Sequence, residues 1–167
     1  MRRILFGSAA ILTALSLTVG ACGTEPTIKA QAPTTTSTLG LSQPVPGGTV
    51  SLSVRYDLPL RSGSTPVWYL TVSNDGLPAI LTFPSGQKGE VVLVGADGAE
   101  VYRWSANRTF IQAIANESLP TADSLVYELE GTELKVPPGE YELVASILAT
   151  PEILPVRQKV IIEPAAP

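Results

Sequence analysis

The feature that most limits how this chain can fold is an alternation of apolar and polar residues that begins at Thr49. In the first run, Val50, Leu52, Val54 and Tyr56 alternate with small or charged residues, which places the apolar side chains on one face of a strand. No segment shows ten or more residues with a clean helical period, so the pattern favours strands. Similar runs, separated by turn-forming residues, lie at 68–73, 80–83, 90–94, 100–104, 125–130, 141–147 and 156–162.

Short strands with one apolar face predict an all-β fold with antiparallel pairing, because an antiparallel sheet can bury one face and leave the other in water. We expect a β-sandwich of about seven to eight strands over residues 49–163, with an unstructured tail at 164–167. The sequence PPGEY at 137–141 favours the immunoglobulin-like type of sandwich, in which a Tyr near a strand start bonds back to the backbone at a corner. The alternative for Tyr141 is an ordinary half-buried strand position.

The N-terminal residues have the layout of an export signal. Two arginines follow Met1, and residues 4–21 are almost entirely apolar and end in small residues. The sequence LTVGAC at 17–22 resembles the bacterial lipobox, after which a Cys receives a diacylglyceryl group and becomes the first residue of the mature chain. We therefore expect residues 1–21 to be a lipoprotein signal peptide and Cys22 to be lipidated. The alternatives are an uncleaved anchor helix and export by a twin-arginine signal.

The lipobox implies that the protein is a membrane-anchored lipoprotein of the bacterial cell envelope, facing the periplasm or the cell exterior. Residues 22–48 contain the Cys and then a stretch rich in Pro, Thr, Gly and Ala with little aliphatic periodicity. This composition is typical of a flexible tether, and about 26 residues of coil reach roughly 25–30 Å. We expect the tether to hold the β domain clear of the lipid headgroups.

Charge and composition exclude several classes of function. Lys plus Arg total 11 against 15 Asp plus Glu, and the sequence pI near 4.8 argues against nucleic-acid binding. The chain has no His and one Cys, which removes His-based catalysis, His metal sites and an intramolecular disulfide. Asp75, Asp97 and Asp123 are weak candidates for calcium ligands, because each lies in a turn where Asp caps its own backbone. We expect no cofactor, no metal and no enzymatic activity.

A series of motifs follows the first two runs of the domain. FPSGQ occurs at 83–87, VYRWS at 101–105, and Phe110 with Gln112-Ala113 follows after a short loop. Together with PGEY at 138–141, this order and spacing resembles the BsuPI family of bacterial intracellular proteinase inhibitors, over about residues 70–148. The resemblance implies an immunoglobulin-like sandwich that binds a protease. The motif residues that would define the fold are Phe83, Gly86, Gln87, Trp104, Gln112 and Tyr141.

Within these motifs, Arg103, Arg108 and Phe110 are the candidate partner-binding residues, since Arg and aromatic side chains are common in the energetic centres of interfaces. The loop at 105–109 is the candidate inhibitory loop, and a trypsin-like serine protease would take Arg108 into its specificity pocket.

A structural role for the same motifs is the competing hypothesis. Tyr102, Trp104 and Phe110 would then belong to the core, while Gln87 and Gln112 would satisfy backbone groups. Alternation along the strand places Trp104 on the same side as Tyr102, which predicts a core position for the indole.

Three functions remain open at this point. The first is a membrane-anchored domain that binds protein and inhibits a serine protease. The second is a structural or accessory interaction module of the cell envelope that inhibits nothing. The third is a sandwich that binds a small ligand, for which only the apolar composition speaks. The expected partner is a protease or another envelope protein, and the lipid anchor would attach the chain to the membrane.

Overall fold

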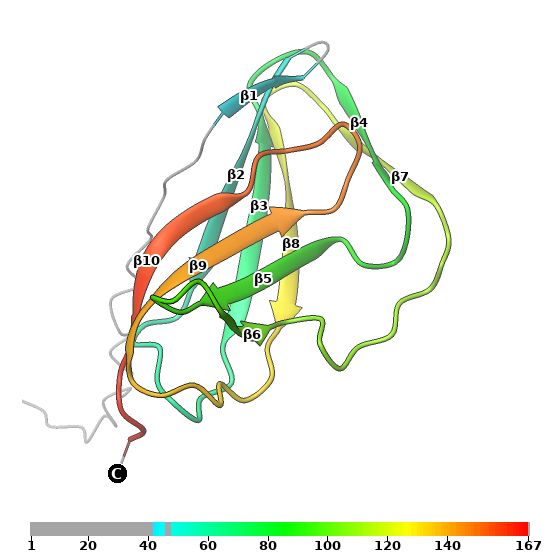
Figure 1. Cartoon of the computed structure of the whole chain (residues 1–167). Helices are drawn as coiled ribbons and strands as arrows, with labels where there is room; N and C mark the ends of the chain where they lie inside the picture. The colour runs from blue at the N-terminus through cyan, green and yellow to red at the C-terminus, as the bar shows by residue number, and fades with distance from the viewer. Residues whose placement is uncertain (1–41, 46–47, 167) are drawn as a thin grey trace, which may run out of the picture. The chain divides into compact units, whose positions relative to one another are not determined.

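The computed structural model describes residues 42–45 and 48–166, and these residues form ten strands and no helix (Figure 1). The predicted signal peptide, Cys22 and most of the predicted tether lie outside the described residues. No helix long and apolar enough to cross a membrane occurs in the described part. The strands are β1 (Ser42–Val45), β2 (Gly48–Tyr56), β3 (Val67–Asn74), β4 (Ala79–Phe83), β5 (Gly89–Val94), β6 (Glu100–Arg103), β7 (Ala115–Leu119), β8 (Asp123–Glu130), β9 (Gly139–Ile147) and β10 (Val156–Ile162).

The strands form two four-stranded sheets and one two-stranded sheet, and the named strands all pair antiparallel. The first sheet has the order β1-β2-β3-β8, and the second has the order β10-β9-β5-β6. The chain crosses between these sheets three times, from β3 to β5, from β6 to β8 and from β8 to β9. Strands β4 and β7 lie on the first two crossings and pair with each other. The expected immunoglobulin-like antiparallel β-sandwich is confirmed (Figure 1).

The core follows the predicted alternation. On β3, Trp68, Leu70 and Val72 are completely buried, while the residues between them remain partly exposed. The indole of Trp68 lies between two tyrosines, with ring centroids 5.4 Å from Tyr56 and 6.3 Å from Tyr102. Because Tyr56 belongs to the first sheet and Tyr102 to the second, this aromatic group helps to hold the two sheets together.

Two of the ten strands were not expected from the sequence. Strand β1 lies inside the segment that we assigned to the tether, and its four residues pair with the start of β2. Strand β7 has the polar sequence ANESL, which shows no apolar alternation, and it pairs with β4 from Ala79 to Phe83. Both strands form because a partner strand offers unpaired backbone groups. The pattern of apolar and polar side chains within a segment does not predict such pairing.

Tyr141 makes the predicted corner. Its hydroxyl donates a hydrogen bond to the Pro137 carbonyl at 2.8 Å, four residues upstream at the start of β9. This contact ties the turn before β9 to the strand, as expected for an immunoglobulin-like sandwich.

Asn74 joins the first two crossings to each other. Its side-chain amide donates to the Leu77 carbonyl at 2.8 Å and, from the second crossing, to the carbonyls of Leu119 at 3.1 Å and Pro120 at 3.2 Å. Its side-chain oxygen accepts from the Gly76 backbone N–H at 2.9 Å, which forms the predicted turn. Asn74 is almost fully buried, so this satisfied amide sets the distance between β3 and the β7–β8 connection.

Candidate functional site

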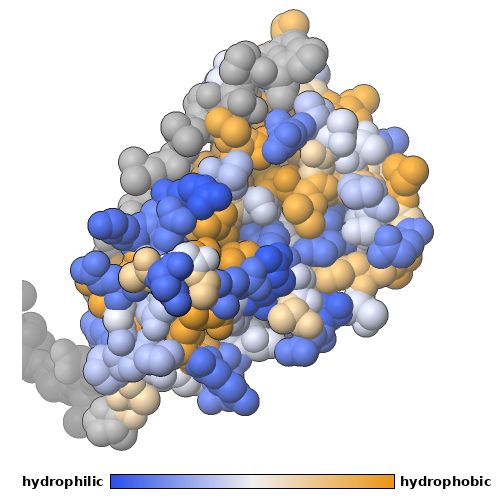
Figure 2. All heavy atoms as spheres, in the orientation of Figure 1, coloured by the Kyte–Doolittle hydropathy of each residue, from blue (hydrophilic) through white to orange (hydrophobic). Residues whose placement is uncertain are grey.

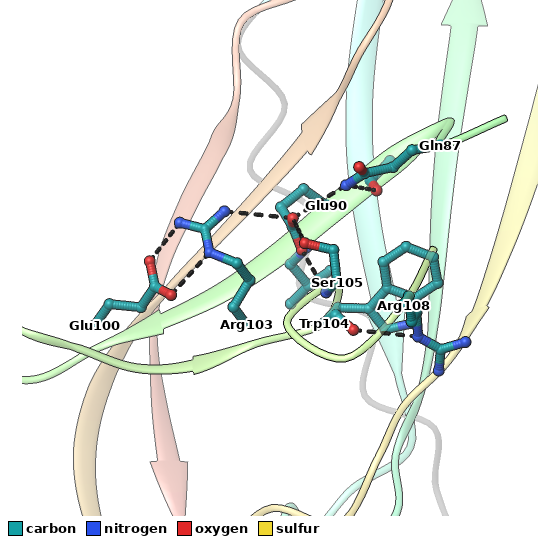
Figure 3. A network of polar contacts seen from close by, with 9 residues as sticks. Gln87, Glu90, Glu100, Arg103, Trp104, Ser105 and Arg108 are labelled. Carbon is teal, nitrogen blue, oxygen red and sulfur yellow. Dashed lines mark hydrogen bonds and ion pairs between the residues drawn. The ribbon is translucent and has the colours of Figure 1, made fainter. Parts of the chain in front are cut away.

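Glu90 on β5 is the centre of a polar network beneath the 101–105 motif (Figure 3). The residue is 6% exposed. Its carboxylate accepts hydrogen bonds from the Gln87 side chain at 3.1 Å, the Ser105 backbone N–H at 3.2 Å and the Arg103 guanidinium at 3.3 Å. The Ser105 hydroxyl and, at 3.1 Å, the Val91 backbone N–H also donate to it. A buried carboxylate with this many donors is a structural anchor for the turn after β6.

Arg103 is held by two carboxylates. In addition to Glu90, its guanidinium pairs with Glu100 through two hydrogen bonds, of which the Nε–Oε1 contact is 2.8 Å (Figure 3). The hydrogen bond to Glu100 raises the pKa of Arg103 further above its ordinary value; desolvation opposes this, and the negative charges of Glu100 and Glu90 add to the increase. The predicted partner-binding role of Arg103 would therefore require the guanidinium to share or leave these ion pairs.

Trp104 is a core residue, as the alternation predicted. It is 7% exposed, and its Nε1–H donates to the Glu130 carbonyl at 2.8 Å. The guanidinium of Arg108 lies 4.4 Å from the centroid of its indole, and the Phe110 ring lies 5.7 Å from it. Arg108 also donates to the carbonyl of Trp104 at 3.2 Å and to that of Glu130. The aromatic strand end and the following loop are thus packed on each other.

Arg103 and Arg108 are exposed and Phe110 is half-buried, but the three side chains do not form one cluster. Figure 3 shows the Arg103 side chain directed towards Glu100 and the Arg108 side chain on the other side of the turn. Phe110 is half-buried and packs against the core beside Trp104. The internal contacts of these residues favour the structural hypothesis for the aromatic motif.

The loop at 105–109 is a compact turn. The Ala106 N–H donates to the Arg103 carbonyl at 3.2 Å, and the Arg108 N–H donates to the Ser105 carbonyl at 3.0 Å. Insertion of Arg108 into a protease pocket would require its guanidinium to leave the indole face. The trypsin-like hypothesis for this loop stays a prediction without geometric support.

The other motif residues support the loops around this turn. Phe83 is completely buried, and the Gln87 amide donates to Glu90, as noted, and to the Gly89 carbonyl at 3.4 Å. The Gly86 N–H donates to the Ile111 carbonyl at 2.8 Å, which joins the FPSGQ turn to the segment before β7. The Gln112 side chain donates to the Phe110 carbonyl at 3.2 Å.

A second polar group links β7 to β8 and to the FPSGQ turn. The Lys88 ammonium lies 3.0 Å from the Glu117 carboxylate and 3.9 Å from the centroid of the Phe83 ring. The Tyr127 hydroxyl donates to the same carboxylate at 2.6 Å. Ser85 and Lys88 have the Ser-x-x-Lys spacing of some hydrolases, but Lys88 is engaged by Glu117 and the Ser85 hydroxyl accepts from the Gln87 backbone at 3.2 Å.

Glu117 should make the stability of the domain depend on pH at the acidic end. Desolvation raises the pKa of this carboxyl, but the hydrogen bonds from Tyr127 and Lys88 and the charge of Lys88 outweigh it, so the pKa lies below its ordinary value of 4.5. A lowered pKa in the folded state contributes stability that is present above the unfolded value and is lost as the pH falls through the folded value. We expect less than about 1 kcal/mol from this partly exposed pair.

Urea denaturation at several pH values between 7 and about 3 measures this contribution. In Glu117→Gln the decrease in unfolding free energy below pH 4.5 should be smaller than in the unchanged chain by that amount. Identical pH profiles for the two proteins would remove Glu117 from the acid sensitivity. Glu152→Gln, at an exposed position, serves as the matched control.

The described residues hold no group of three or more metal-ligating side chains. The Asp97 carboxylate accepts from the Ala99 N–H at 3.0 Å, and that of Asp123 accepts from the Ser124 N–H at 2.7 Å, so both cap their own turns. Two surface pockets of about 240 and 320 Å³ are open to solvent. Val94, Tyr141 and Lys159 contribute to the smaller one.

Sequence reasoning missed one exposed element. Residues 110–114 lie between the turn and β7, and Ile111 and Ile114 are 78% and 76% exposed. A loop without periodicity gives no signal that its apolar residues will face water rather than the core. The signal that the sequence offered was two isoleucines in a short segment without strand alternation.

The fold and these contacts define a protein of the immunoglobulin-like β-sandwich class, in which polar and aromatic side chains hold the loops at one end of the sheets. The chain belongs to the BsuPI family of intracellular proteinase inhibitors, whose family model matches residues 55–152. This match contains the whole segment in which the sequence motifs resembled that family.

The solved structures that match the chain share little sequence with it. A CARDB domain from Pyrococcus furiosus, solved in complex with di-metal ions, is 12% identical with a TM-score of 0.39, over 71% of this chain and 90% of that chain. A putative ApaA protein from Bordetella pertussis is 14% identical with a TM-score of 0.34, over 74% of this chain and 100% of that chain. No curated protein sequence matches.

Proposed function

We propose that this protein is a lipid-anchored inhibitor of a serine protease in the bacterial cell envelope. The match of residues 55–152 to a family of proteinase inhibitors is the observation that carries the proposal. The composition is consistent with it, because a chain without His and with a single Cys lacks the residues of the common serine- and cysteine-protease mechanisms and would act by binding.

The proposed location rests on the sequence before the domain. The lipobox residues at 17–22 would place a lipid on Cys22, and the tether would let the domain reach proteases close to the membrane. Two or more acyl chains on one Cys would hold the protein stably, at about 0.8 kcal/mol per buried CH₂. The family description calls its members intracellular, so the exported form proposed here would carry the same domain to a different compartment.

Replacement of Cys22 by serine should release the protein from the membrane. Without the thiol no lipid can be attached, so the chain should appear as unprocessed precursor or as secreted material. Fractionation of cells followed by immunoblotting measures the distribution, and incorporation of labelled palmitate measures the lipid. A serine variant that is fully processed and remains in the membrane fraction would contradict the lipobox. Ser8→Ala inside the apolar stretch is the matched control.

Inhibition is tested by titration with the full chain purified in a mild detergent. Trypsin, chymotrypsin, elastase and subtilisin are assayed with peptide substrates in the same detergent. A stoichiometric or micromolar inhibition of at least one of them supports the proposal. Unchanged activity of all four at micromolar concentrations of the chain, together with an intact thermal transition, counts against it.

The alternative is an interaction module of the cell envelope that does not inhibit. The observation in its favour is that Arg103, Arg108 and Phe110 are engaged in contacts within the domain. A pull-down from envelope extract separates the two functions, because an inhibitor recovers a protease and a structural module recovers a different envelope protein.

A further inference from the structure

The segment from Phe110 to Ile114 is fastened at both ends. At its start the Phe110 ring packs on Trp104, and the Ile111 carbonyl accepts from the Gly86 N–H at 2.8 Å. At its end the chain enters β7, where Ala115 pairs with Phe83 of β4. In Figure 1 this connection between β6 and β7 runs along the outer right-hand side of the domain.

Between these supports the segment stands away from the domain. Ile111, Gln112, Ala113 and Ile114 are four consecutive exposed residues, although successive side chains of an extended chain point to opposite sides. Neither side of the segment is therefore packed on the sheets. Among the described large apolar residues, Ile111 and Ile114 are the two most exposed, and both belong to this short stretch. Figure 2 shows apolar residues at the surface on the side where β4 and β7 lie.

The backbone of the segment is open as well. In the described part of the chain, the N–H and C=O groups of Gln112, Ala113 and Ile114 have no backbone hydrogen-bond partner. The one non-glycine residue with a positive φ in that part is Ala122, so the residues of this segment have negative φ values. A segment with free backbone groups can bind by adding an extended strand to another protein, while alternate side chains fill its pockets.

We propose that residues Ile111–Ile114 are the segment that enters the active-site cleft of the protease, with the two isoleucines in aliphatic subsites. This inference rests on the proposed inhibitory function. Residues 109–116 have no charged side chain, which fits a cleft with apolar subsites and does not fit a trypsin-like pocket. The two fastened ends keep the loss of conformational entropy on binding small.

The FPSGQ turn fixes one end of the proposed binding segment. The Gly86 N–H donates a hydrogen bond to the Ile111 carbonyl, so the turn holds the backbone of the segment in place. A Cβ at Gly86 would meet the Ile111 backbone at 3.5 Å, an ordinary contact, and glycine is therefore not required there for space. The FPSGQ motif thus positions the binding segment, and both lie within the residues that the family model matches.

The test compares three variants of the full chain in the protease titration described above: Ile111→Gln, Ile114→Gln and Ile161→Gln. Glutamine is close to isoleucine in length and adds no charge. Ile161 on β10 is also highly exposed, at 65%, and lies in the β10-β9-β5-β6 sheet, outside the segment, which makes it the matched control. Thermal unfolding of each variant reports whether the domain is intact.

We expect the inhibition constant for elastase or subtilisin to rise at least about 30-fold in Ile111→Gln or Ile114→Gln, as for a central interface residue, and less than about threefold in Ile161→Gln. Equal inhibition by all three variants would overturn the assignment of the segment while the inhibitory function stands. If Arg108→Ala loses more inhibition than either segment variant, the inhibitory site is the 105–109 turn and the proposal is wrong.

Two further outcomes have separate meanings. If the unchanged chain inhibits none of the four proteases, the proposed function fails and the inference falls with it. If sedimentation shows a dimer that Ile111→Gln dissociates while inhibition is unchanged, the segment binds a second copy of this chain instead, which also overturns the proposal.

Discussion

Replacement of Trp104 by alanine is expected to lower the free energy of unfolding by about 3–5 kcal/mol. The indole is 7% exposed and packs between the Phe110 ring and the guanidinium of Arg108. Its loss would open a cavity at the end of the sandwich and remove the Nε1–H donor of the Glu130 carbonyl. The two side chains that lie against it would also lose their support.

Denaturation of the full chain by urea, followed by far-UV circular dichroism, measures this effect. Trp104→Phe should cost less, about 1–2 kcal/mol, because the ring keeps most of the buried area and loses the hydrogen bond. Val101→Ala, at a position 41% exposed on the preceding strand β6, is the control and should change stability by less than about 1 kcal/mol. A loss below about 1 kcal/mol for Trp104→Ala would mean that the indole faces solvent.

Replacement of Glu90 by leucine should cost about 2–4 kcal/mol. The carboxylate is buried and accepts hydrogen bonds from Gln87, Arg103 and Ser105, so its removal leaves donors without a partner beneath the turn. Arg103 keeps Glu100 and is partly exposed, which limits the penalty for its charge.

The same urea measurement tests the Glu90 variant, with Glu100→Gln as its control. Glu100 forms an exposed ion pair with the same arginine, and its replacement should cost less than about 1 kcal/mol. If the two variants lose equal free energy of unfolding, the buried position of Glu90 does not add to its contribution to stability. Hydrogen exchange at the Ser105 amide adds a local reading, since this N–H loses its acceptor in the leucine variant alone.

Much of the fold was predictable because side-chain alternation is a local property. The runs containing Trp68 and Val160 became β3 and β10 with the expected faces buried. Tyr141 made its corner because the PPGEY turn brings the hydroxyl to a carbonyl four residues away. Trp104 was predictable as a core residue for the same local reason.

The candidate site was less predictable because its contacts join residues far apart in the chain. Arg108 meets the Glu130 carbonyl 22 residues away, and Ser105 meets Glu90 15 residues away. The expectation of an exposed arginine at 108 followed from a polar loop and agrees with its exposure, but that pattern did not show that the guanidinium lies on the indole of Trp104.

The amino-acid sequence by itself determined the type of element, the buried face of eight strands, the family and the predicted lipid attachment, because each of these depends on residues close together in the chain. Only the tertiary structure decided that ANESL becomes β7, since that polar segment is a strand through pairing with β4. It also decided how the exposed loop side chains are held. Arg108 in the exposed turn at 105–109 lies on the indole of Trp104, while Ile111 and Ile114 face water between the two fastened ends of their segment. Exposure depends on what the rest of the chain covers, and a local pattern carries no information about that.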